Sequence, residues 1–351
     1  MSSPARAHET AVSVCRRAHA RLEPTLREAV HRLPQQLSRM SGYHFGWWGP
    51  DGTPTDRAMP GKAVRPALAY LAAEALGAPA EHATPGAAAV ELVHNFALVH
   101  DDIMDGDHTR RGRPALWQQY GTGPALLAGD GLYALAADTL AAPRTQRSCW
   151  ALTLLTRAMI TTLHGQAYDH AFTRAPWSGP GSVTLADYRR AASAKTGALL
   201  AAATAIGALL AGGGPREVAR FALFGRGLGV AFQCADDLLG LWGEPAGTGK
   251  PVGTDLSEGR RTLPLVAALN SGTTAGDRLH ALLRRSEGRL STEDLHTALE
   301  LTEAAGGRTA TEAEARRRQE AALSVLAGLP MPARVRTELL ATAHYVTARR
   351  T

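Results

Sequence analysis

Long Ala- and Leu-rich segments, broken by short stretches with Gly and Pro, run through most of this 351-residue chain. Ala and Leu favour helix, and no run shows the sustained apolar–polar alternation of a half-buried strand. The fold class is therefore predicted to be all-α. The spacing predicts helices over residues 63–76, 84–104, 122–141, 146–172, 185–211, 215–240, 260–270, 275–286, 292–304, 309–326 and 331–349.

An amphipathic helix is also predicted over residues 10–40, where aliphatic residues recur every three or four positions at Leu22, Leu26, Val30, Leu33 and Leu37. Pro24 and Pro34 are expected to divide or kink it. The Gly- and Pro-rich residues 41–60 are predicted to form a loop, with Trp47 and Trp48 as packing anchors.

The chain contains no internal repeat and no low-complexity linker, so one domain is expected over residues 1–351. Within it, residues 1–60 would form the N-terminal helix and the Gly/Pro/Trp loop. Residues 61–270 carry the motifs described below, and residues 271–351 would form the C-terminal helices.

The net charge of +6 and the pI near 9.5 suggest an anionic partner: nucleic acid, a membrane surface or phosphorylated small molecules. Nucleic acid is not favoured, because zinc-finger spacings and RNA-binding aromatic motifs are missing. The three widely spaced cysteines fit a reducing cytoplasm. Residues 196–215 lack charge and are long enough to span a bilayer, but their Ala, Gly and Thr content indicates a buried helix rather than a transmembrane segment.

One largely apolar predicted helix ends in the acidic motif D-D-I-M-D. Asp101 and Asp105 are four residues apart, so a helix places both on one face, one turn apart. Oxygen-only ligands of this kind favour a hard cation such as Mg²⁺. A charged helix end without a metal is the alternative that this motif alone leaves open. Arg110 and Arg111 follow closely and favour a metal–diphosphate site, because arginine binds phosphate in a bidentate manner.

A second apolar predicted helix ends in paired acids, Asp236 and Asp237, 135 residues after the first motif. A Gly-rich loop follows, and then Arg260 and Arg261. The order of acids, loop and cations repeats that of the first motif. Two such helix ends facing one cavity would hold a single diphosphate through shared metal ions, which also favours one domain.

In their order along the chain, these motifs resemble those of the trans-prenyl diphosphate synthase (polyprenyl synthetase) family, which includes farnesyl and geranylgeranyl diphosphate synthases. The resemblance covers roughly residues 60–270. The motifs that carry it are Gly61-Lys62 with Arg65-Pro66, His94, D-D-I-M-D with Arg110-Arg111-Gly112, Gly129-Asp130, Gly165-Gln166 with Asp169, Lys195-Thr196, Phe232-Gln233 with Asp236-Asp237, and Gly249-Lys250. The resemblance implies a helical bundle of the isoprenoid synthase type with a central active-site cavity, acting as a homodimer.

The resemblance also implies the activity, a head-to-tail condensation of isopentenyl diphosphate with dimethylallyl, geranyl or farnesyl diphosphate, and a role for each matching residue. The expected ligands of a cluster of up to three Mg²⁺ ions, replaceable by Mn²⁺, are Asp101, Asp102, Asp105, Asp236 and Asp237. Residues expected to hold the allylic diphosphate are Arg110, Lys195 and Lys250, and those for isopentenyl diphosphate are Lys62, Arg65, His94 and Arg111. Gln233 is expected near the reacting carbons or a metal-bound water, with Thr196 turning its oxygen atoms toward the allylic cation. The expected catalytic residues are Asp101, Asp102, Asp105, Lys195, Gln233 and Asp236.

Three positions depart from the family pattern. Gly240 stands where a third acid is usual in the second motif. Because the first acid of that motif is the main ligand in the family, metal binding is expected to survive in weakened form. Ala63 replaces a common arginine, which is expected to cost affinity for isopentenyl diphosphate. Arg260 stands where lysine is usual and conserves the charge only.

Product length is expected to depend on Phe96 and Ala97, five and four residues before Asp101. In the family, a bulky residue at the first position and a small one at the second often give a twenty-carbon product. The resemblance therefore implies geranylgeranyl diphosphate, with farnesyl diphosphate next. The alternative is that Phe96 only packs in the core.

Two other functions remain open at this point. A class I terpene cyclase shares the fold and the first acidic motif, but an N-D-x-x-S-x-x-x-E segment is missing here. A non-catalytic partner subunit of a prenyl synthase would fit the departures at Ala63 and Gly240.

Overall fold

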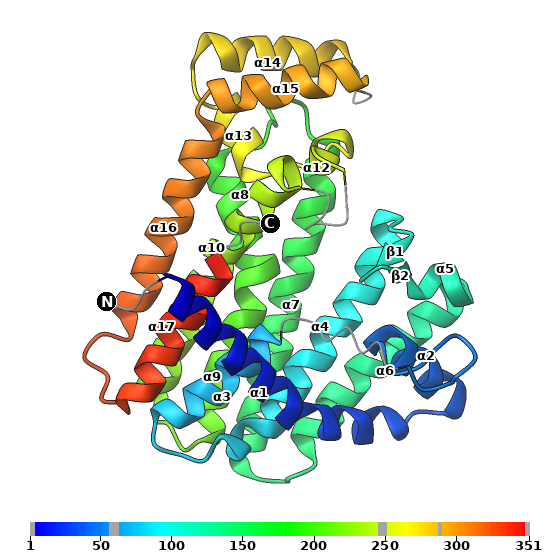
Figure 1. Cartoon of the computed structure of the whole chain (residues 1–351), viewed down its shortest axis with the longest axis vertical. Coiled ribbons are helices and arrows are strands. Elements are labelled where there is room, and N and C mark those ends of the chain that lie inside the picture. The colour runs from blue at the N-terminus through cyan, green and yellow to red at the C-terminus, as the bar shows by residue number, and fades with distance from the viewer. Residues whose placement is uncertain (1–3, 56–62, 178, 245–250, 287–289, 348–351) are drawn as a thin grey trace. The chain divides into compact units, whose positions relative to one another are not determined.

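The computed structural model describes residues 4–55, 63–177, 179–244, 251–286 and 290–347 (Figure 1). Nearly all of its regular structure is helical, so the prediction of an all-α fold is confirmed. Two short strands, β1 (Thr109–Arg110) and β2 (Arg113–Pro114), form an antiparallel hairpin directly after the first acidic motif.

The chain divides into two compact units. Unit 1 comprises residues 1–157, 202–222 and 328–342, and unit 2 comprises residues 158–201, 223–327 and 343–351. The division falls inside four helices: α7 (Gln146–Arg174), α9 (Ala198–Leu210), α10 (Pro215–Trp242) and α17 (Ala333–Thr347). The expectation of one domain stays a prediction.

Unit 1 carries the first acidic motif. Its complete helices are α1 (Pro4–His31), α2 (Gln35–Phe45), α3 (Val64–Ala75), the 3₁₀ turn η1 (Ala80–Ala83), α4 (Thr84–Asp105), α5 (Leu116–Tyr120) and α6 (Thr122–Ala141). Helix α4 packs along α6, and α3 packs against both α1 and α4. A Cβ atom at Gly207 of α9 would lie 2.2 Å from the carbonyl oxygen of Ala69 in α3, so these two helices meet backbone to backbone.

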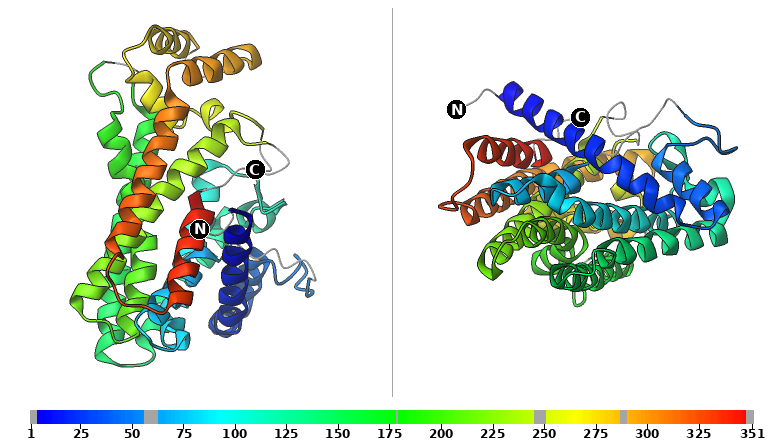
Figure 2. Two further views of the ribbon diagram at one scale, coloured as in Figure 1. Left: turned by 60° about the vertical axis from the view of Figure 1, so that its left-hand side comes forward. Right: turned by 90° about the horizontal axis from the view of Figure 1, so that it is seen from below.

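Unit 2 carries the second acidic motif. Its complete elements are α8 (Leu185–Ala192), the π-helix η2 (Ser193–Gly197), α12 (Thr254–Ser257), α13 (Leu263–Leu269), α14 (Thr274–Arg285), α15 (Thr292–Ala304) and α16 (Gly307–Val325). Helices α14 and α15 lie side by side (Figures 1 and 2). They share an apolar core with the end of α10, in which Leu241, Leu265 and Leu279 are fully buried.

Most predicted helix boundaries fall within three residues of those observed, because Gly and Pro mark the breaks between helices. The N-terminal segment differs. Helix α1 continues through Pro24 and ends before Pro34, whereas α2 runs on to Phe45, inside the region predicted as loop. Trp47 stacks on Phe45 with ring centroids 4.5 Å apart, as a packing anchor would.

By length and composition, the stretch Leu185–Leu210 could cross a membrane. In the structure 78% of the most apolar part of this stretch is buried, as in the core helix of a folded protein. The sequence prediction of a buried helix over this stretch agrees with this burial.

Candidate active site

The first acidic motif forms the last turn of α4, which ends at Gly106 in the left-handed conformation (φ 69°). Glycine adopts this conformation without steric cost. Asp105 is exposed, Asp101 is half-buried and Asp102 is fully buried. The helical spacing places Asp101 and Asp105 on one face of α4, as predicted.

Asp102 is paired with Arg110 of β1. The Arg110 Nε donates to Asp102 Oδ1 at 2.9 Å, its Nη2 contacts the same carboxylate, and Asp107 Oδ2 lies 3.5 Å from Nη2. Burial by itself would lower the pKa of Arg110, but the hydrogen bond and charge of Asp102 outweigh it and raise that pKa. The pair fastens the hairpin to the end of α4. Metal binding by Asp102 and phosphate binding by Arg110 stay predictions.

Three residues predicted to bind isopentenyl diphosphate lie close to one another in unit 1. His94 is on α4, Arg65 is on α3, and Arg111 occupies the hairpin turn with a positive φ of 53°. Burial, followed by the charges of Arg65 and Arg111, holds the pKa of His94 well below its usual range. These residues therefore present two guanidinium groups and a neutral imidazole.

A pocket in unit 1 opens beside these arginines. Its lining residues are Tyr43, His44, Phe45, Gly46, Arg110, Arg111, Arg113, Pro114 and Leu116. The Arg113 guanidinium lies 4.1 Å from the centroid of the Tyr43 ring and donates to the Trp48 carbonyl at 2.9 Å. Three arginines on one wall give the pocket a positive potential that suits an anionic ligand.

His44 is the neutral group of this pocket. Its Nε2 lies 3.1 Å from Asn95 Oδ1, and the side chain is buried. Burial and the charges of Arg111 and Arg110 lower the pKa of His44 to about 3. A neutral imidazole therefore donates its Nε2 proton to Asn95.

The two predicted chain-length residues lie on α4, one turn before the acids. The Phe96 ring lies 4.5 Å from the His100 ring and 5.4 Å from the ring of Tyr133 on α6, measured between centroids. Ala97 beside it is half-buried. Phe96 thus belongs to an aromatic cluster that joins α4 to α6.

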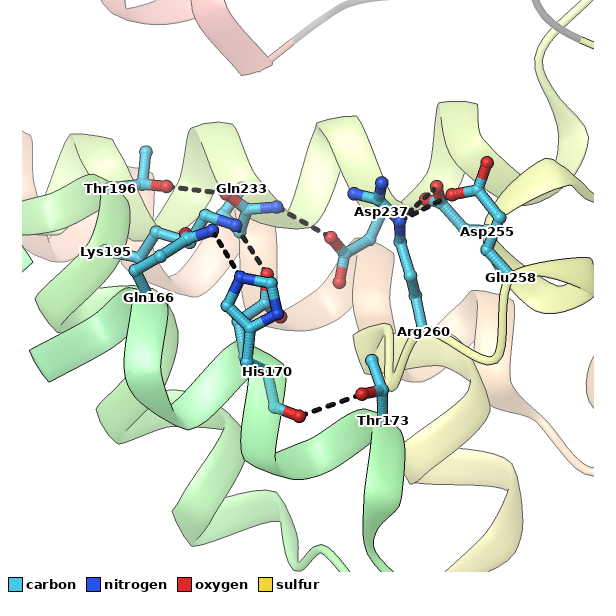
Figure 3. A network of polar contacts seen from close by, with 11 residues as sticks. Gln166, His170, Thr173, Lys195, Thr196, Gln233, Asp237, Asp255, Glu258 and Arg260 are labelled. Atoms are coloured by element: carbon cyan, nitrogen blue, oxygen red, sulfur yellow. Dashed lines mark hydrogen bonds and ion pairs between the residues drawn. The ribbon is translucent and has the colours of Figure 1, made fainter. Parts of the chain in front are cut away.

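The second acidic motif lies in unit 2, where polar side chains of α10 and η2 are linked by hydrogen bonds (Figure 3). Thr196 Oγ1 donates to Gln233 Oε1 at 2.6 Å, and Gln233 Nε2 donates to Asp237 Oδ1 at 2.9 Å. Asp237 Oδ2 also accepts from the Tyr188 hydroxyl at 2.5 Å and from the Leu263 backbone N–H at 2.6 Å.

Asp237 is therefore a buried carboxylate surrounded by donors. Burial raises its pKa to about 7, although the hydrogen bonds from Leu263, Tyr188 and Gln233 act in the opposite direction. Its two oxygens face these partners inside unit 2 rather than solvent. Metal binding by Asp237 stays a prediction, as it does for the half-buried Asp236.

Lys195 forms an ion pair with Asp169 of α7. The π-helix that carries Lys195 touches α7 closely: a Cβ atom at Gly165 would lie 2.2 Å from the Lys195 backbone nitrogen. Helix α8 before it begins with a capping box, in which Thr184 and Asp187 exchange hydrogen bonds. A cavity in unit 2 is lined by Lys195 and its neighbours: Asp169, Phe172, Tyr188, Ala191, Ala192, Gln233, Asp237, Asp255, Arg260, Arg261 and Thr262.

Asp255 occupies the space that a side chain at position 240 would need. A Cβ atom at Gly240 would lie 1.8 Å from Asp255 Oδ2. The Arg260 Nε lies 3.8 Å from Asp255 Oδ1 and 2.7 Å from Glu258 Oε2 (Figure 3). The glycine that replaces a third acid thus leaves room for a carboxylate from the following loop.

The sequence profile described as "Polyprenyl synthetase" matches residues 54–301. The chain belongs to the polyprenyl synthetase family. It is 43% identical over 336 residues to the (2E,6E)-farnesyl diphosphate synthase of Mycobacterium tuberculosis, covering 95% of this chain and 91% of the relative. It is equally identical, over 313 residues, to the geranylgeranyl diphosphate synthase of the same organism, with 88% of this chain and 87% of the relative covered.

Crystal structures of polyprenyl synthetases have the same fold. The polyprenyl synthetase of Streptomyces coelicolor A3(2) has a TM-score of 0.89 and 41% identity, over 96% of this chain and 99% of that one. The polyprenyl synthase of Caulobacter crescentus CB15, complexed with calcium and isoprenyl diphosphate, has a TM-score of 0.83 and 28% identity, over 98% of both chains. The predicted family and enzyme class, a prenyltransferase of isoprenoid biosynthesis, are confirmed.

Polyprenyl synthetases depend on a divalent metal. Asp101 and Asp105 in unit 1 and Asp236 in unit 2 carry the oxygen donors that such an ion prefers. In the part of the chain that the structure describes, however, no three His, Cys, Asp or Glu side chains are gathered into a group that could hold a metal ion. Asp255 adds a carboxylate at the place that Gly240 leaves open. Lys62 and Lys250, predicted to bind isopentenyl and allylic diphosphate, lie outside the described residues, so their roles stay predictions.

Sequence reasoning about this polyprenyl synthetase missed several residues of the two pockets. Asp255 and Tyr188 were given no role, because neither belongs to an acidic pair. The only signal for Asp255 was its place after a Gly-rich loop and five residues before Arg260. His44 and Arg113 lie outside the motifs. The hairpin places Arg113 opposite Arg110, whereas His44 comes from α2 and reaches the same pocket through tertiary packing.

Proposed function

We propose that the chain condenses isopentenyl diphosphate head-to-tail with an allylic diphosphate in the presence of Mg²⁺, and that its product is geranylgeranyl diphosphate. The observation that carries the product length is the position of Phe96, held against His100 and Tyr133 beside the small Ala97. Relatives that make farnesyl and geranylgeranyl diphosphate are equally similar to the chain, so overall identity favours neither product.

The two acidic motifs would share the binding of one allylic diphosphate. Asp101, Asp102, Asp105 and Asp236 are the residues that would hold up to three Mg²⁺ ions, which when bound neutralise the diphosphate and make it a better leaving group. Asp237, whose two oxygens already accept from Tyr188, Leu263 and Gln233, would support this site from behind. Arg110, Lys195 and Lys250 add positive charge to the same group. The ion pair of Lys195 with Asp169 supports this role, because it holds the ammonium group in the cavity wall of unit 2.

Isopentenyl diphosphate would bind through Lys62, Arg65, His94 and Arg111. The mutual influence of Arg65, His94 and Arg111 supports a common anion site. The neutral imidazole of His94 donates a hydrogen bond without adding a third repelling charge. Ala63 in place of a common arginine would weaken this site.

Ionisation of the allylic substrate would leave a carbocation that the isopentenyl double bond attacks, and the departed diphosphate would take up the proton that is lost. The chain then has to orient the reacting carbons and exclude water. Gln233 and Thr196 would direct oxygen atoms toward the cation. Their hydrogen bond supports a shared role, because it fixes both side chains together.

Product length would be set by the aromatic cluster of Phe96, His100 and Tyr133. A growing prenyl chain that reaches these three contacting rings would stop there, because the rings block its path. The small Ala97 would admit a twenty-carbon product, whereas a second bulky residue would stop the chain at fifteen carbons.

The test is incubation of the protein with Mg²⁺, labelled isopentenyl diphosphate and each of the three allylic primers, followed by chromatography of the products. The expected product is geranylgeranyl diphosphate from every primer. Farnesyl diphosphate as the end product would contradict the length assignment. A hydrocarbon would indicate a cyclase instead, and no reaction would indicate a non-catalytic subunit.

Variants of α4 sharpen this test. Phe96→Ala should lengthen the product and Ala97→Phe should shorten it to farnesyl diphosphate. Leu98→Ala is the matched control, because a residue two positions after Phe96 points to a nearly opposite side of the helix. Equal products from all three variants would show that Phe96 only packs in the core.

A second copy of the chain is the partner that we propose for an apolar surface of unit 1. Leu126 and Leu127 of α6 and Trp150 of α7 are exposed, Leu127 to 59% and Trp150 to 52%. Large apolar side chains that are left exposed support association with a partner. The three free cysteines support the cytoplasm as the compartment.

A further inference from the structure

A chain of hydrogen bonds in the cavity wall of unit 2 joins η2, α8, α10 and α13. We propose that Asp237 and Tyr188 are positioning residues, which fix the amide of Gln233 with its NH₂ group toward Asp237 and its oxygen toward Thr196. The role of that orientation in catalysis rests on the proposed function. The orientation itself is a property of the fold.

The direction of the hydrogen bonds starts at the backbone. The Leu263 N–H can only donate, and it donates to Asp237 Oδ2 at 2.6 Å. The Tyr188 hydroxyl donates to the same oxygen at 2.5 Å. Both side chains are buried, with Asp237 4% and Tyr188 6% exposed, so water does not compete for these contacts.

The remaining oxygen of Asp237 then determines the orientation of Gln233. Asp237 Oδ1 lies 2.9 Å from Gln233 Nε2, and in its ionised form the carboxylate accepts but cannot donate. The NH₂ group of Gln233 must therefore face Asp237. The Gln233 oxygen is left on the other side of the amide.

Thr196 completes the chain. Its Oγ1 donates to Gln233 Oε1 at 2.6 Å, and the side chain is buried. With its proton committed to Gln233, Thr196 keeps both lone pairs for other partners. An amide turned by 180° would present NH₂ to Thr196 and force the hydroxyl to accept. The carboxylate of Asp237 thus determines the direction in which both Gln233 and Thr196 donate their hydrogen bonds.

This polarity has a consequence for the cavity, because Gln233 forms part of its wall. In the observed orientation, the amide oxygen and the Thr196 oxygen form an electron-rich pair that favours a developing allylic cation. In the turned orientation, amide hydrogens replace the oxygen and oppose the cation. Binding of the diphosphate groups would be unaffected, so the effect belongs to kcat rather than KM.

The position of Asp237 in α10 separates its role from that of Asp236. Consecutive helical residues point about 100° apart. Asp236 is half-buried, whereas Asp237 is turned into the protein toward Tyr188 and Leu263. The two adjacent acids therefore have different tasks, one toward ligands and one toward Gln233.

The test exchanges the carboxylate and the amide. In Asp237→Asn the oxygen must still face the Leu263 N–H, so the new NH₂ group faces Gln233 and turns its amide. We expect kcat to fall by roughly tenfold or more with KM for both substrates nearly unchanged. In Gln233→Glu two carboxylates face each other, which should lower both Tm and kcat.

The double variant Asp237→Asn with Gln233→Glu restores the original polarity. The carboxylate introduced at position 233 accepts from both Thr196 and the amide introduced at position 237. Tm should therefore rise above that of Gln233→Glu alone, and kcat should exceed that of either single variant. Additive losses in both Tm and kcat would overturn the proposal.

Tyr188→Phe should lower kcat modestly, because it removes one donor to Asp237. Tyr168→Phe is the matched control: Tyr168 is exposed, so kcat should stay unchanged.

The two readouts separate this proposal from the proposed function. A wild-type protein that makes no prenyl diphosphate would refute the proposed function, whereas the double-variant cycle in Tm would still decide the orientation of Gln233. A wild-type enzyme that is active and is matched in kcat by Asp237→Asn would refute the positioning role alone.

Discussion

The protonation of each buried ionisable group in this protein depends on a few neighbouring side chains. Asp102 is buried with Arg110, Asp237 is surrounded by three donors, and His44 stays neutral between Asn95 and two arginines. A buried ionisable group without such partners would cost several kcal/mol. Each of these groups therefore ties a segment of chain to a definite place near a pocket.

His44 should make stability depend on pH. In the unfolded chain it binds a proton near pH 6.5, whereas burial and the nearby arginines lower its pKa in the folded protein to about 3. As pH falls below 6.5, the unfolded state binds a proton at His44 and the folded state does not. The free energy of unfolding therefore falls until about pH 3. Denaturation by urea at several pH values between 7 and 4 measures this slope.

The variant His44→Gln isolates the contribution. It should make the pH dependence between 6.5 and 4 less steep, because glutamine does not titrate, and should leave the part that comes from His94, whose pKa is also lowered. A slope in His44→Gln equal to that of the wild type would show that His44 does not remain neutral in the folded state.

At the scale of helices, glycine decides where two backbones touch. Gly165 allows α7 to approach the π-helix η2, which presents Lys195 and Thr196. π-helical turns are rare and often occur at functional sites. The position of the Lys195 ammonium group thus depends on a residue on another helix that has no side chain.

Gly165→Ala should therefore cost about 1–3 kcal/mol of stability, because the added methyl group meets backbone that cannot turn aside. It should also lower kcat by displacing η2. The matched control is Gly123→Ala in α6, where a Cβ atom meets nothing within 4 Å; it should be neutral or stabilise by up to about 1 kcal/mol. Equal effects of both changes on Tm would contradict the close contact.

Helix positions were largely predictable from the sequence, and helix details were not. The helices at 122–141 and 292–304 have the predicted bounds, because apolar periodicity and helix-breaking residues are local signals. The π-helix inside 185–211 was missed, because a single wider turn leaves no signal in the apolar pattern of the sequence. The pairing of Tyr188 with Asp237, 49 residues apart, also depends on tertiary structure.

For the candidate site, the paired acids and the arginines that follow them could be read from the sequence alone. The family resemblance added roles for Lys195 and Gln233, and all of these roles stay predictions. The motifs could not show which acids face inward. Asp102 and Asp237 look like their neighbours in sequence, and only burial distinguishes them.

At the scale of the whole molecule, the exposed apolar residues of unit 1 predict a dimer. Leu127→Glu should shift the protein toward monomer, because burying a charge at an interface costs far more than burying leucine. Leu340→Glu is the matched control, since Leu340 of α17 is also exposed, to 40%. Size-exclusion chromatography with light scattering measures the mass. A monomeric wild type, or equal dissociation of both variants, would contradict the proposed surface.

The most direct test of the central claim is a crystal structure with Mg²⁺ and inorganic pyrophosphate. We expect metal ions that are bound by Asp101 and Asp105 of the first motif and by Asp236 of the second, all on one pyrophosphate. A structure in which the two motifs bind no common pyrophosphate would contradict the mechanism.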